Sequence, residues 1–295
     1  MRIVGLKQSD GAVLVGALND DGTEITVITD LDTFWSAPDA HLASEPAGPT
    51  LATAAVELVP PVLPSARVVC VGLNYQDHVN EGSFRDETLP EFPTLFARWP
   101  TSLSVGGAEI PIPSGEDGLD WEGEVMAWVG ATLVDATPEE ALAAVVGYST
   151  FNDITSRRAQ KLTSQWIIGK NGDHSGPVGP MVPATEVGDL RYGLRLETRV
   201  NGEVVQHSST AEMIYGVGET LAHISKTFTI NRGDLLATGT PSGVGYARTP
   251  PWLLQPGDVV EVEIERLGIL TNHIVDNTHR HPPVDAARIE NQEIQ

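Results

Sequence analysis

Short runs that alternate apolar and polar residues recur along the chain, and such alternation is typical of β-strands with one buried face. Near the start of the chain these runs cover residues 2–6, 12–17 and 24–29, with polar turn clusters between them. A stretch rich in Ala, Pro and Glu then leads to the proline-rich residues 60–64, which suit a linker. We therefore predict a small N-terminal domain over residues 1–60 and a main domain over residues 67–276.

The main domain is also rich in predicted strands. We expect a helix that begins at Thr137 with a capping box and ends at Gly147, and further helices over about residues 211–225. Asn201-Gly202 is a strong signal for a tight hairpin turn. The remaining polar residues, 277–295, show no periodicity and are predicted to be a C-terminal tail. The fold class predicted is α+β, mostly β, with strands expected over residues 68–73, 120–129, 194–200, 204–207, 234–238, 259–265 and 269–275.

Composition excludes several classes of function. With a net charge of −22 and only four lysines among 295 residues, the chain is a poor partner for nucleic acid, because phosphate binding needs clustered basic side chains. It has no apolar run near the roughly 20 residues of a membrane helix, and polar residues at positions 7, 9 and 10 argue against a signal peptide. A single cysteine, Cys70, indicates a reducing compartment, so we expect a cytoplasmic protein.

Three carboxylates stand on strands that look buried. Glu122 and Glu124 are two residues apart, so strand alternation points them to the same face, and Asp153 follows another apolar strand. Paired glutamates alone are weak evidence, since exposed strands often carry them. Buried carboxylates held this close need a cation, and an all-oxygen set suits magnesium or manganese rather than zinc. Lys170 follows in sequence and adds a second candidate cation.

His78 and Glu81 lie in a polar stretch, residues 74–90, that has little apolar periodicity and is a candidate mobile loop. One helical turn there would bring the two side chains together, and an imidazole beside a carboxylate can act as a general base. A surface turn with incidental charges also explains the pattern. Among the other histidines, His174 is notable because it lies close to Lys170 in sequence.

Residues 238–245 are rich in glycine and follow a predicted strand, so their backbone N–H groups could hold an anion. They lack the glycine spacing and the Gly-Lys-Ser/Thr ending of a nucleotide-binding P-loop. An ordinary turn between strands explains the glycines equally well. Four basic side chains near the carboxylates in sequence could reverse the local charge for an acidic substrate: Arg157, Arg158, Lys161 and Lys170.

These segments, in this order, resemble the fumarylacetoacetate hydrolase family, whose members share a Gly-Leu-Asn-Tyr-x-x-His-x-x-Glu segment. The resemblance covers roughly residues 67–276, and the N-terminal segment is not distinctive. It rests on Gly72 to Glu81, Asp120 to Glu124, Asn152-Asp153 with Arg157 and Gln160, Gly169-Lys170 with Asp173, Gly179-Pro180, Val200-Asn201-Gly202 with Gln206, and Gly233-Asp234 through Gly245.

The resemblance implies a C-terminal domain built as a rolled mixed β-sandwich, a lid that carries His78 and Glu81, and assembly as a homodimer. It implies that Mg²⁺ or Mn²⁺ binds to Glu122, Glu124 and Asp153, with His78, Glu81 and Lys170 as catalytic residues. One departure is Arg98, at a position where many relatives carry Lys, which alters the contact that this position can make. The substrate-binding residues implied are Tyr75, Arg98, Arg157, Gln160 and Thr240.

The expected activity is hydrolytic cleavage of a carbon–carbon bond in an acylpyruvate or a related 1,3-dicarbonyl or 2-oxo acid. In that reaction the metal and Lys170 would stabilise an enolate, and His78, oriented by Glu81, would activate water. Decarboxylation of an oxaloacetate-like acid and keto–enol isomerisation of a hydroxymuconate-type acid use the same enolate and remain alternatives. A non-enzymatic binding protein on the same scaffold is the competing class.

Overall fold

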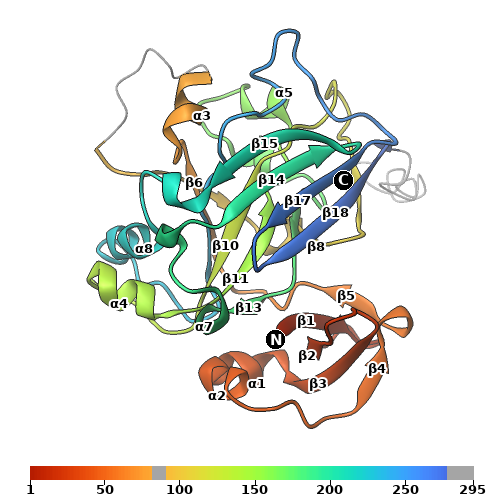
Figure 1. The fold of residues 1–295 in the computed structure, drawn as a ribbon, viewed down its shortest axis with the longest axis vertical. Helices are drawn as coiled ribbons and strands as arrows, with labels where there is room; N and C mark the ends of the chain where they lie inside the picture. The colour runs from red at the N-terminus through yellow and green to blue at the C-terminus, as the bar shows by residue number, and fades with distance from the viewer. Residues whose placement is uncertain (82–90, 278–295) are drawn as a thin grey trace, which may run out of the picture.

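The protein is described by a computed structural model that covers residues 1–81 and 91–277. Most of its regular structure is in strands, which form three sheets (Figure 1). The smallest unit contains the first 60 residues and lies at one end of the molecule, coloured red and orange in Figure 1. The two other sheets, built from later residues, form the larger body. The domain boundaries given above stay predictions.

The N-terminal sheet has the strand order β4-β3-β2-β1-β5 and is antiparallel throughout. Its strands confirm the three alternating runs seen in the sequence. The sheet and its two short helices comprise β1 (Arg2–Lys7), β2 (Val13–Leu18), β3 (Glu24–Asp30), α1 (Leu31–Ser36), α2 (Pro38–Leu42), β4 (Thr50–Ala52) and β5 (Glu57–Val59).

An eight-stranded mixed sheet carries the site described below. Its order is β7-β6-β16-β10-β11-β12-β8, with β13 also paired to β11, and the β16–β6 and β12–β8 pairs are parallel. Its strands are β6 (Val68–Gly72), β7 (Thr94–Arg98), β8 (Leu103–Val105), β10 (Gly123–Val129), β11 (Val145–Asn152), β12 (Gly176–Val178), β13 (Val182–Pro183) and β16 (Leu235–Ala237).

A five-stranded sheet packs against the eight-stranded one. Its order is β15-β14-β17-β18-β9, and only the β18–β9 pair is parallel. Asn201 and Gly202 both have positive φ between β14 and β15, which confirms the predicted tight hairpin turn. The strands are β9 (Glu109–Pro111), β14 (Arg195–Val200), β15 (Glu203–Ser209), β17 (Val259–Ile264) and β18 (Gly268–Val275).

Strand β10 lies at the centre of the molecule, and every residue in it is buried. Val125 and Val129 face one core together with Val262 of β17, between the two large sheets. Met126 and Trp128 point the opposite way, into a core shared with the N-terminal sheet. Because both faces are covered, the strand is apolar almost throughout, and Glu124 is its one charged residue. The prediction of an α+β, mostly β fold with a rolled mixed sandwich is confirmed.

The N-terminal sheet is fixed to the outer face of the eight-stranded sheet. Trp35 stacks on Trp128 with ring centroids 6.0 Å apart, and both rings are buried. Ile3 exchanges two backbone hydrogen bonds with Met181, of 2.8 and 2.9 Å. Burying large aromatic rings in this way is a strong source of stability. The N-terminal unit therefore supports β10, the strand that carries Glu124.

The helices are short and lie at the edges of the sheets. The predicted capping box at Thr137 is confirmed, but the helix ends at Ala143, and Gly147 lies inside β11. The expected stop at Gly147 was wrong because a buried strand begins only two residues after the helix. The helices of the main body are α3 (Gln76–Glu81), α4 (Pro138–Ala143), α5 (Arg157–Gln160), α6 (Ile167–Lys170), α7 (Ala184–Val187) and α8 (Val217–Ser225).

Two predictions fall at the edge of the described residues. The loop predicted over 74–90 contains α3, so its first part is helical, and residues 82–90 lie outside the described chain. Nearly all of the predicted C-terminal tail, residues 278–295, lies outside it as well. The helices predicted over about residues 211–225 are found as a short 3-10 helix at Thr210–Glu212 and as α8.

Candidate metal centre and active site

Pairing of two buried strands brings the three predicted carboxylates together. Gly123, at the start of β10, lies opposite Asn152, at the end of β11, so the residues that flank this pair meet at one edge of the sheet. The Asp153 N–H donates to the Glu122 carbonyl at 2.9 Å, which fixes the register there. One carboxylate oxygen from each of Glu122, Glu124 and Asp153 lies within 4.8 Å of the others, and all three residues are buried.

Lys170, at the end of α6, is a cation in direct contact with this cluster. Its Nζ lies 2.6 Å from an oxygen of Glu122 and 2.6 Å from an oxygen of Asp153. The lysine is only 2% exposed. Burial alone would lower the pKa of Lys170, but the two carboxylates outweigh it and raise the pKa above its ordinary value. Lys170 is therefore a fixed positive charge and not a base at neutral pH.

Arg157, at the start of α5, occupies the other side of Glu122. Its Nη2 lies 2.7 Å from Glu122 and 2.7 Å from Asp120, and its Nε donates to the same Asp120 oxygen at 2.7 Å. Its Nη1 donates to Gln160 at 3.1 Å. Arg157 thus connects the carboxylate cluster to the cavity wall, where Gln160 also lies.

The pKa values of Glu122 and Glu124, which are two residues apart, shift in opposite directions. Burial would raise the pKa of Glu122, but Lys170 and Arg157 outweigh it and hold that pKa below the ordinary value. Burial raises the pKa of Glu124 well above its ordinary value, and the negative charges of Asp153 and Glu122 add to the rise. The metal-free cluster therefore favours a proton on Glu124, which a divalent cation would displace.

Arg98, expected to contact substrate, lies behind the cluster instead. It is 1% exposed and is absent from the residues that line the cavity. Its Nε donates to Asp153, Nη2 donates to the Ile154 carbonyl at 2.7 Å, and Nη1 donates to Ser175 at 2.9 Å. The guanidinium donates to three acceptors from three different nitrogens, a spacing that the single nitrogen of a lysine cannot match, and one of these acceptors is Asp153.

The glycine-rich loop at residues 238–245 uses its backbone N–H groups to hold carboxylates of the protein itself. Gly239 donates to Glu124 at 2.8 Å, Gly243 donates to Glu81 at 2.8 Å, and Gly245 donates to Asp120 at 2.7 Å. The backbone donors expected in this loop are present, but these three donate to side chains of the protein. The loop therefore orients the site rather than offering all of its donors to a ligand.

Asp120 is a site residue that the sequence analysis did not single out. It is fully buried, and it accepts from Arg157, Gly245 and, at 3.1 Å, the N–H of Tyr246. The signal was present in the sequence, because Asp120 precedes Glu122 and Glu124 at the same two-residue spacing. Its role is to anchor Arg157 and the end of the glycine-rich loop.

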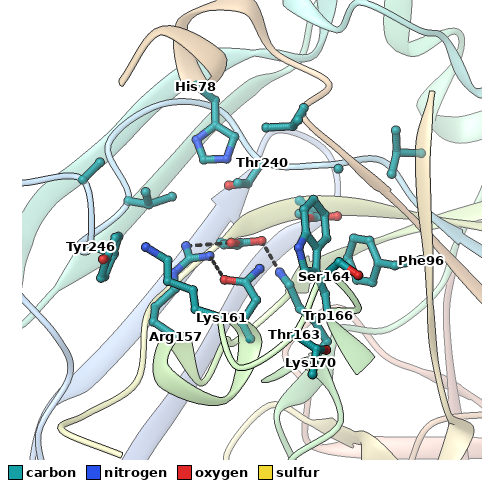
Figure 2. A pocket seen from close by; sticks show the side chains of 18 residues that line it. His78, Phe96, Arg157, Lys161, Thr163, Ser164, Trp166, Lys170, Thr240 and Tyr246 are labelled. Atoms are coloured by element: carbon teal, nitrogen blue, oxygen red, sulfur yellow. Dashed lines mark hydrogen bonds and ion pairs between the residues drawn. The ribbon is translucent and has the colours of Figure 1, made fainter. Parts of the chain in front are cut away.

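His78 and Glu81 meet as the helical spacing predicted. In α3 the Nδ1 of His78 lies 2.8 Å from Glu81 Oε1, and the other oxygen of Glu81 accepts from Gly243. With Nδ1 facing a carboxylate, its proton is held there and Nε2 is left for proton exchange. Figure 2 shows the imidazole above Thr240, on the side of the cavity opposite Lys170.

A cavity of about 530 Å³ opens over the carboxylates (Figure 2). Phe96 and Trp166 form an apolar wall at one end, with their rings 5.4 Å apart. Lys161 and Tyr246 lie at the opposite end. The predicted site residues that line the cavity are His78, Glu122, Glu124, Arg157, Gln160, Lys170 and Thr240, and other lining residues are Val71, Leu73, Thr163, Ser164 and Val244.

Gln206, on β15, fixes the position of Thr240. Its Nε2 donates to the Thr240 hydroxyl at 2.8 Å and to the Pro241 carbonyl at 2.9 Å. Because the hydroxyl oxygen of Thr240 already accepts this bond, its own proton is free to be donated into the cavity. Gln206 lies 34 residues from Thr240 in sequence, so only the fold reveals their contact.

Three predicted residues lie away from the cavity. Tyr75 is 2% exposed and packs in the main core, so it is not among the lining residues. Arg158 faces outward and donates to the Gly115 carbonyl at 2.8 Å. His174 is exposed, and its Nδ1 lies 3.1 Å from the Glu109 carbonyl. Neither basic residue adds charge to the site.

The geometry of the site agrees with the sequence resemblance, and comparison with known proteins decides the family. The family model for the fumarylacetoacetate (FAA) hydrolase C-terminal domain matches residues 67–275. The chain belongs to the fumarylacetoacetate hydrolase family. An oxaloacetate tautomerase of Bacillus subtilis (strain 168) is 40% identical over 215 residues, which cover 72% of this chain and 70% of that protein.

Two solved structures of the fumarylacetoacetate hydrolase family are similar across most of the chain. A fumarylacetoacetate hydrolase from Exiguobacterium antarcticum is 34% identical with a TM-score of 0.76, and the match covers 94% of this chain and 99% of that one. A fumarylpyruvate hydrolase from Pseudomonas aeruginosa, in complex with Mn²⁺ and pyruvate, is 32% identical with a TM-score of 0.65. That match covers 74% of this chain and 91% of the other.

This member of the fumarylacetoacetate hydrolase family is an enzyme, and its acidic residues suit a divalent metal ion. The fit rests on the three buried carboxylates. Among them, Glu124 has a raised pKa because no cation of the protein offsets its burial and the nearby negative charges. An all-oxygen donor set favours a hard ion. Within residues 1–81 and 91–277, no helix is both long and apolar enough to cross a membrane.

Proposed function

We propose that this enzyme interconverts the keto and enol forms of a small 2-oxo acid of the oxaloacetate type. The observation that carries the proposal is the position of His78, oriented by Glu81, across the cavity from Lys170 and the carboxylate cluster. A base on one side and fixed positive charge on the other are what proton abstraction next to a carbonyl requires. The similarity to an oxaloacetate tautomerase favours this reaction.

The protein's own groups can carry each step. His78 Nε2 removes a proton from the carbon beside the substrate carbonyl, and Glu81 stabilises the imidazolium that forms. The electron pair moves to the carbonyl oxygen, where the ammonium of Lys170 offsets the new negative charge. Transfer of the proton held by the His78 imidazolium to that oxygen gives the enol and restores the neutral base, and the reverse sequence returns the keto form. The Thr240 hydroxyl, and the Arg157 and Gln160 side chains, orient the substrate carboxylate.

A divalent metal ion, when bound, supplies further positive charge that polarises the substrate carbonyl. We assign its ligands as Glu122, Glu124 and Asp153. Magnesium and manganese both suit these oxygen ligands, and manganese is the ion in the related fumarylpyruvate hydrolase structure. The apolar wall formed by Phe96 and Trp166 keeps water from one side of the cavity, which strengthens the charge interactions inside it.

Hydrolysis of an acylpyruvate is the second candidate, favoured by the similarity to the two hydrolases and by the His78–Glu81 pair. In that reaction His78 would take a proton from water, and the water oxygen would attack the carbonyl distal to the substrate carboxylate. The carbon–carbon bond then breaks and the enolate of pyruvate leaves. Decarboxylation of oxaloacetate passes through the same enolate and is the third outcome to be tested.

One experiment separates these reactions. The purified enzyme with Mg²⁺ or Mn²⁺ is mixed with oxaloacetate and with acylpyruvates, and the enol, keto and cleaved products are followed by ultraviolet absorbance and proton NMR. We expect faster keto–enol exchange of oxaloacetate without loss of carbon dioxide. Cleavage of acylpyruvates with no effect on keto–enol exchange would favour hydrolysis. No acceleration of any reaction, with metal bound, would contradict the proposal.

We also propose a homodimer in the cytoplasm, as the sequence suggests. Exposed apolar side chains of Trp99, Leu162 and Ile168 line a groove beside α5 and α6, which is a surface that a second copy could cover. Light scattering of the purified chain, alone and with Trp99→Glu, tests the assembly. A mass of one subunit for the parent chain would contradict it.

A further inference from the structure

Lys161 is a cation that faces the cavity without a carboxylate partner. The other two cations in the cavity wall, Arg157 and Lys170, are each within 2.7 Å of protein carboxylates. Among the residues that the structure describes, the Nζ of Lys161 makes no ion pair or hydrogen bond, although Lys161 lines the same cavity. In an acidic chain with only four lysines, this charge is directed at the substrate space rather than at the protein.

An aromatic ring holds the ammonium of Lys161 at the mouth of the cavity. Its Nζ lies 3.4 Å from the centroid of the Tyr246 ring, which is a cation–π contact. The backbone N–H of Tyr246 is fixed in turn by Asp120. Figure 2 shows Lys161 and Tyr246 together at the end of the cavity opposite Phe96. The position of this charge is therefore set by the fold, although the side chain is exposed.

The net charge of the buried cluster indicates which part of a substrate Lys161 can bind. The cluster contains four carboxylates and three cations, so a divalent ion would leave one positive charge, which the carboxylate of a 2-oxo acid neutralises. A second carboxylate on the same substrate would find no unpaired cation inside the cluster. The groups in this balance are Asp120, Glu122, Glu124 and Asp153 on one side and Arg98, Arg157 and Lys170 on the other.

We propose that Lys161 determines specificity for 2-oxo dicarboxylates by binding the carboxylate distal to the 2-oxo group. The inference rests on the proposed function, because it assumes that a 2-oxo acid binds at the cluster. Lys161 is the C-cap residue of α5, four positions after Arg157, so the two ends of the substrate would be recognised from the two ends of one short helix. The Tyr246 ring positions Lys161 and does not itself need to contact the substrate.

Paired ligands that differ only in the distal carboxylate test this proposal. One pair is 2-oxoglutarate and 2-oxopentanoate, and the other is 2-oxoadipate and 2-oxohexanoate, each bound in the presence of Mg²⁺ and measured by calorimetry. For the parent enzyme and for Lys161→Ala, the ratio of the two dissociation constants in each pair is compared. We expect the preference for the diacid to fall by about fivefold or more in Lys161→Ala, with binding of the monoacids unchanged.

Further variants distinguish binding from structure. Lys161→Arg keeps the charge and should restore most of the preference, whereas Lys226→Ala removes an exposed lysine outside the cavity and should leave it unchanged. Tyr246→Leu should weaken the preference, because the ammonium loses its aromatic support. High salt should reduce the preference in the parent enzyme, because the lysine is exposed.

The possible outcomes separate this inference from the proposed function. If both pairs give the same ratios in the parent enzyme and in Lys161→Ala, the distal role of Lys161 is wrong, while binding of the acids still supports the function. If none of the four acids binds to the metal-loaded parent enzyme, the proposed function itself is contradicted.

Discussion

Gly123, between the two glutamates of the candidate metal centre, donates its N–H to the buried Gln206 side chain at 3.0 Å. No side chain fits at Gly123, since a Cβ there would lie 2.4 Å from the Thr198 hydroxyl. The same Gln206 oxygen accepts from Thr198 at 2.8 Å, and its amide nitrogen reaches Thr240. One amide therefore links the carboxylate cluster to the substrate-facing loop, and all four of its hydrogen-bonding positions are used.

Replacing this amide should damage the site and the fold together. Gln206→Leu keeps a similar volume but leaves the Gly123 N–H and the two threonine hydroxyls without their partner. Each buried polar group left unsatisfied costs about 1 to 3 kcal/mol, so we expect a loss of at least that size in the free energy of unfolding. Urea titration measures it, with Gln8→Leu as the control. A variant as stable as the parent chain would contradict the linking role of Gln206.

Glu124 is the ligand whose replacement should separate metal binding from folding. In Glu124→Gln we expect Mg²⁺ and Mn²⁺ to lose their stabilising effect on the melting temperature, because only the folded cluster binds the ion. The matched control is Glu203→Gln, which removes an exposed carboxylate on β15. An equal metal-induced shift in Glu124→Gln and in the parent enzyme would remove Glu124 from the ligand set.

The stability of the metal-free enzyme should depend on pH through the same residue. The pKa of Glu124 is raised in the folded chain, so above its ordinary value of 4.5 the folded state binds more protons than the unfolded state. Its contribution to the free energy of unfolding therefore falls as pH rises from 4.5 toward the raised pKa. Measured with a chelator present, Glu124→Gln should lose less stability than the parent over this range. Parallel pH profiles would contradict the raised pKa.

His78 and Glu81 should differ in what they contribute to turnover. His78→Ala removes the proposed base, so kcat should fall by roughly 10²- to 10⁴-fold, while the metal-dependent rise in melting temperature remains. Glu81→Gln removes the charge and the bond from Gly243 but keeps one oxygen that can accept from His78 Nδ1, so it should give a smaller fall in kcat. An unchanged kcat in His78→Ala would require another base.

Local patterns in the sequence predicted the parts of the site that depend on local geometry. Glu122 and Glu124 share a face because strands alternate, and His78 meets Glu81 because helices bring residues three apart together. Neither strand alternation nor helical spacing predicts which distant segment of the chain contacts a residue. Gln206 reaches Gly123 across 83 positions of sequence, a contact that only sheet packing creates.

The contacts that the sequence did not predict have the same origin. Arg98 looked like a substrate contact because it stands in a family motif, but β7 turns it toward Asp153, behind the cavity. Tyr75 is likewise taken into the core. In the glycine-rich loop the backbone donors were foreseen, but their acceptors come from segments more than a hundred residues earlier in the chain, at Glu124 and Asp120. Alternation and spacing cannot determine such partners.

Arg98 gives the sharpest test of how the cluster is supported from behind. Arg98→Lys keeps the positive charge near Asp153 but cannot satisfy Ser175 and the Ile154 carbonyl as well, because lysine presents one compact ammonium in place of a planar fork. Loss of a partner that orients a metal ligand typically weakens metal affinity by about 10- to 100-fold, so we expect a shift of that size in the Mg²⁺ or Mn²⁺ dissociation constant. Arg158→Lys, on the outward side of α5, should leave metal affinity unchanged and is the matched control.

Arg98→Met should be more severe than Arg98→Lys and should lower the melting temperature, because it leaves Asp153 buried with one cation fewer. Calorimetric titration with metal measures the first effect, and equal affinity in Arg98→Lys and the parent enzyme would show that charge alone, and not the three-acceptor geometry of Arg98, holds Asp153 in place.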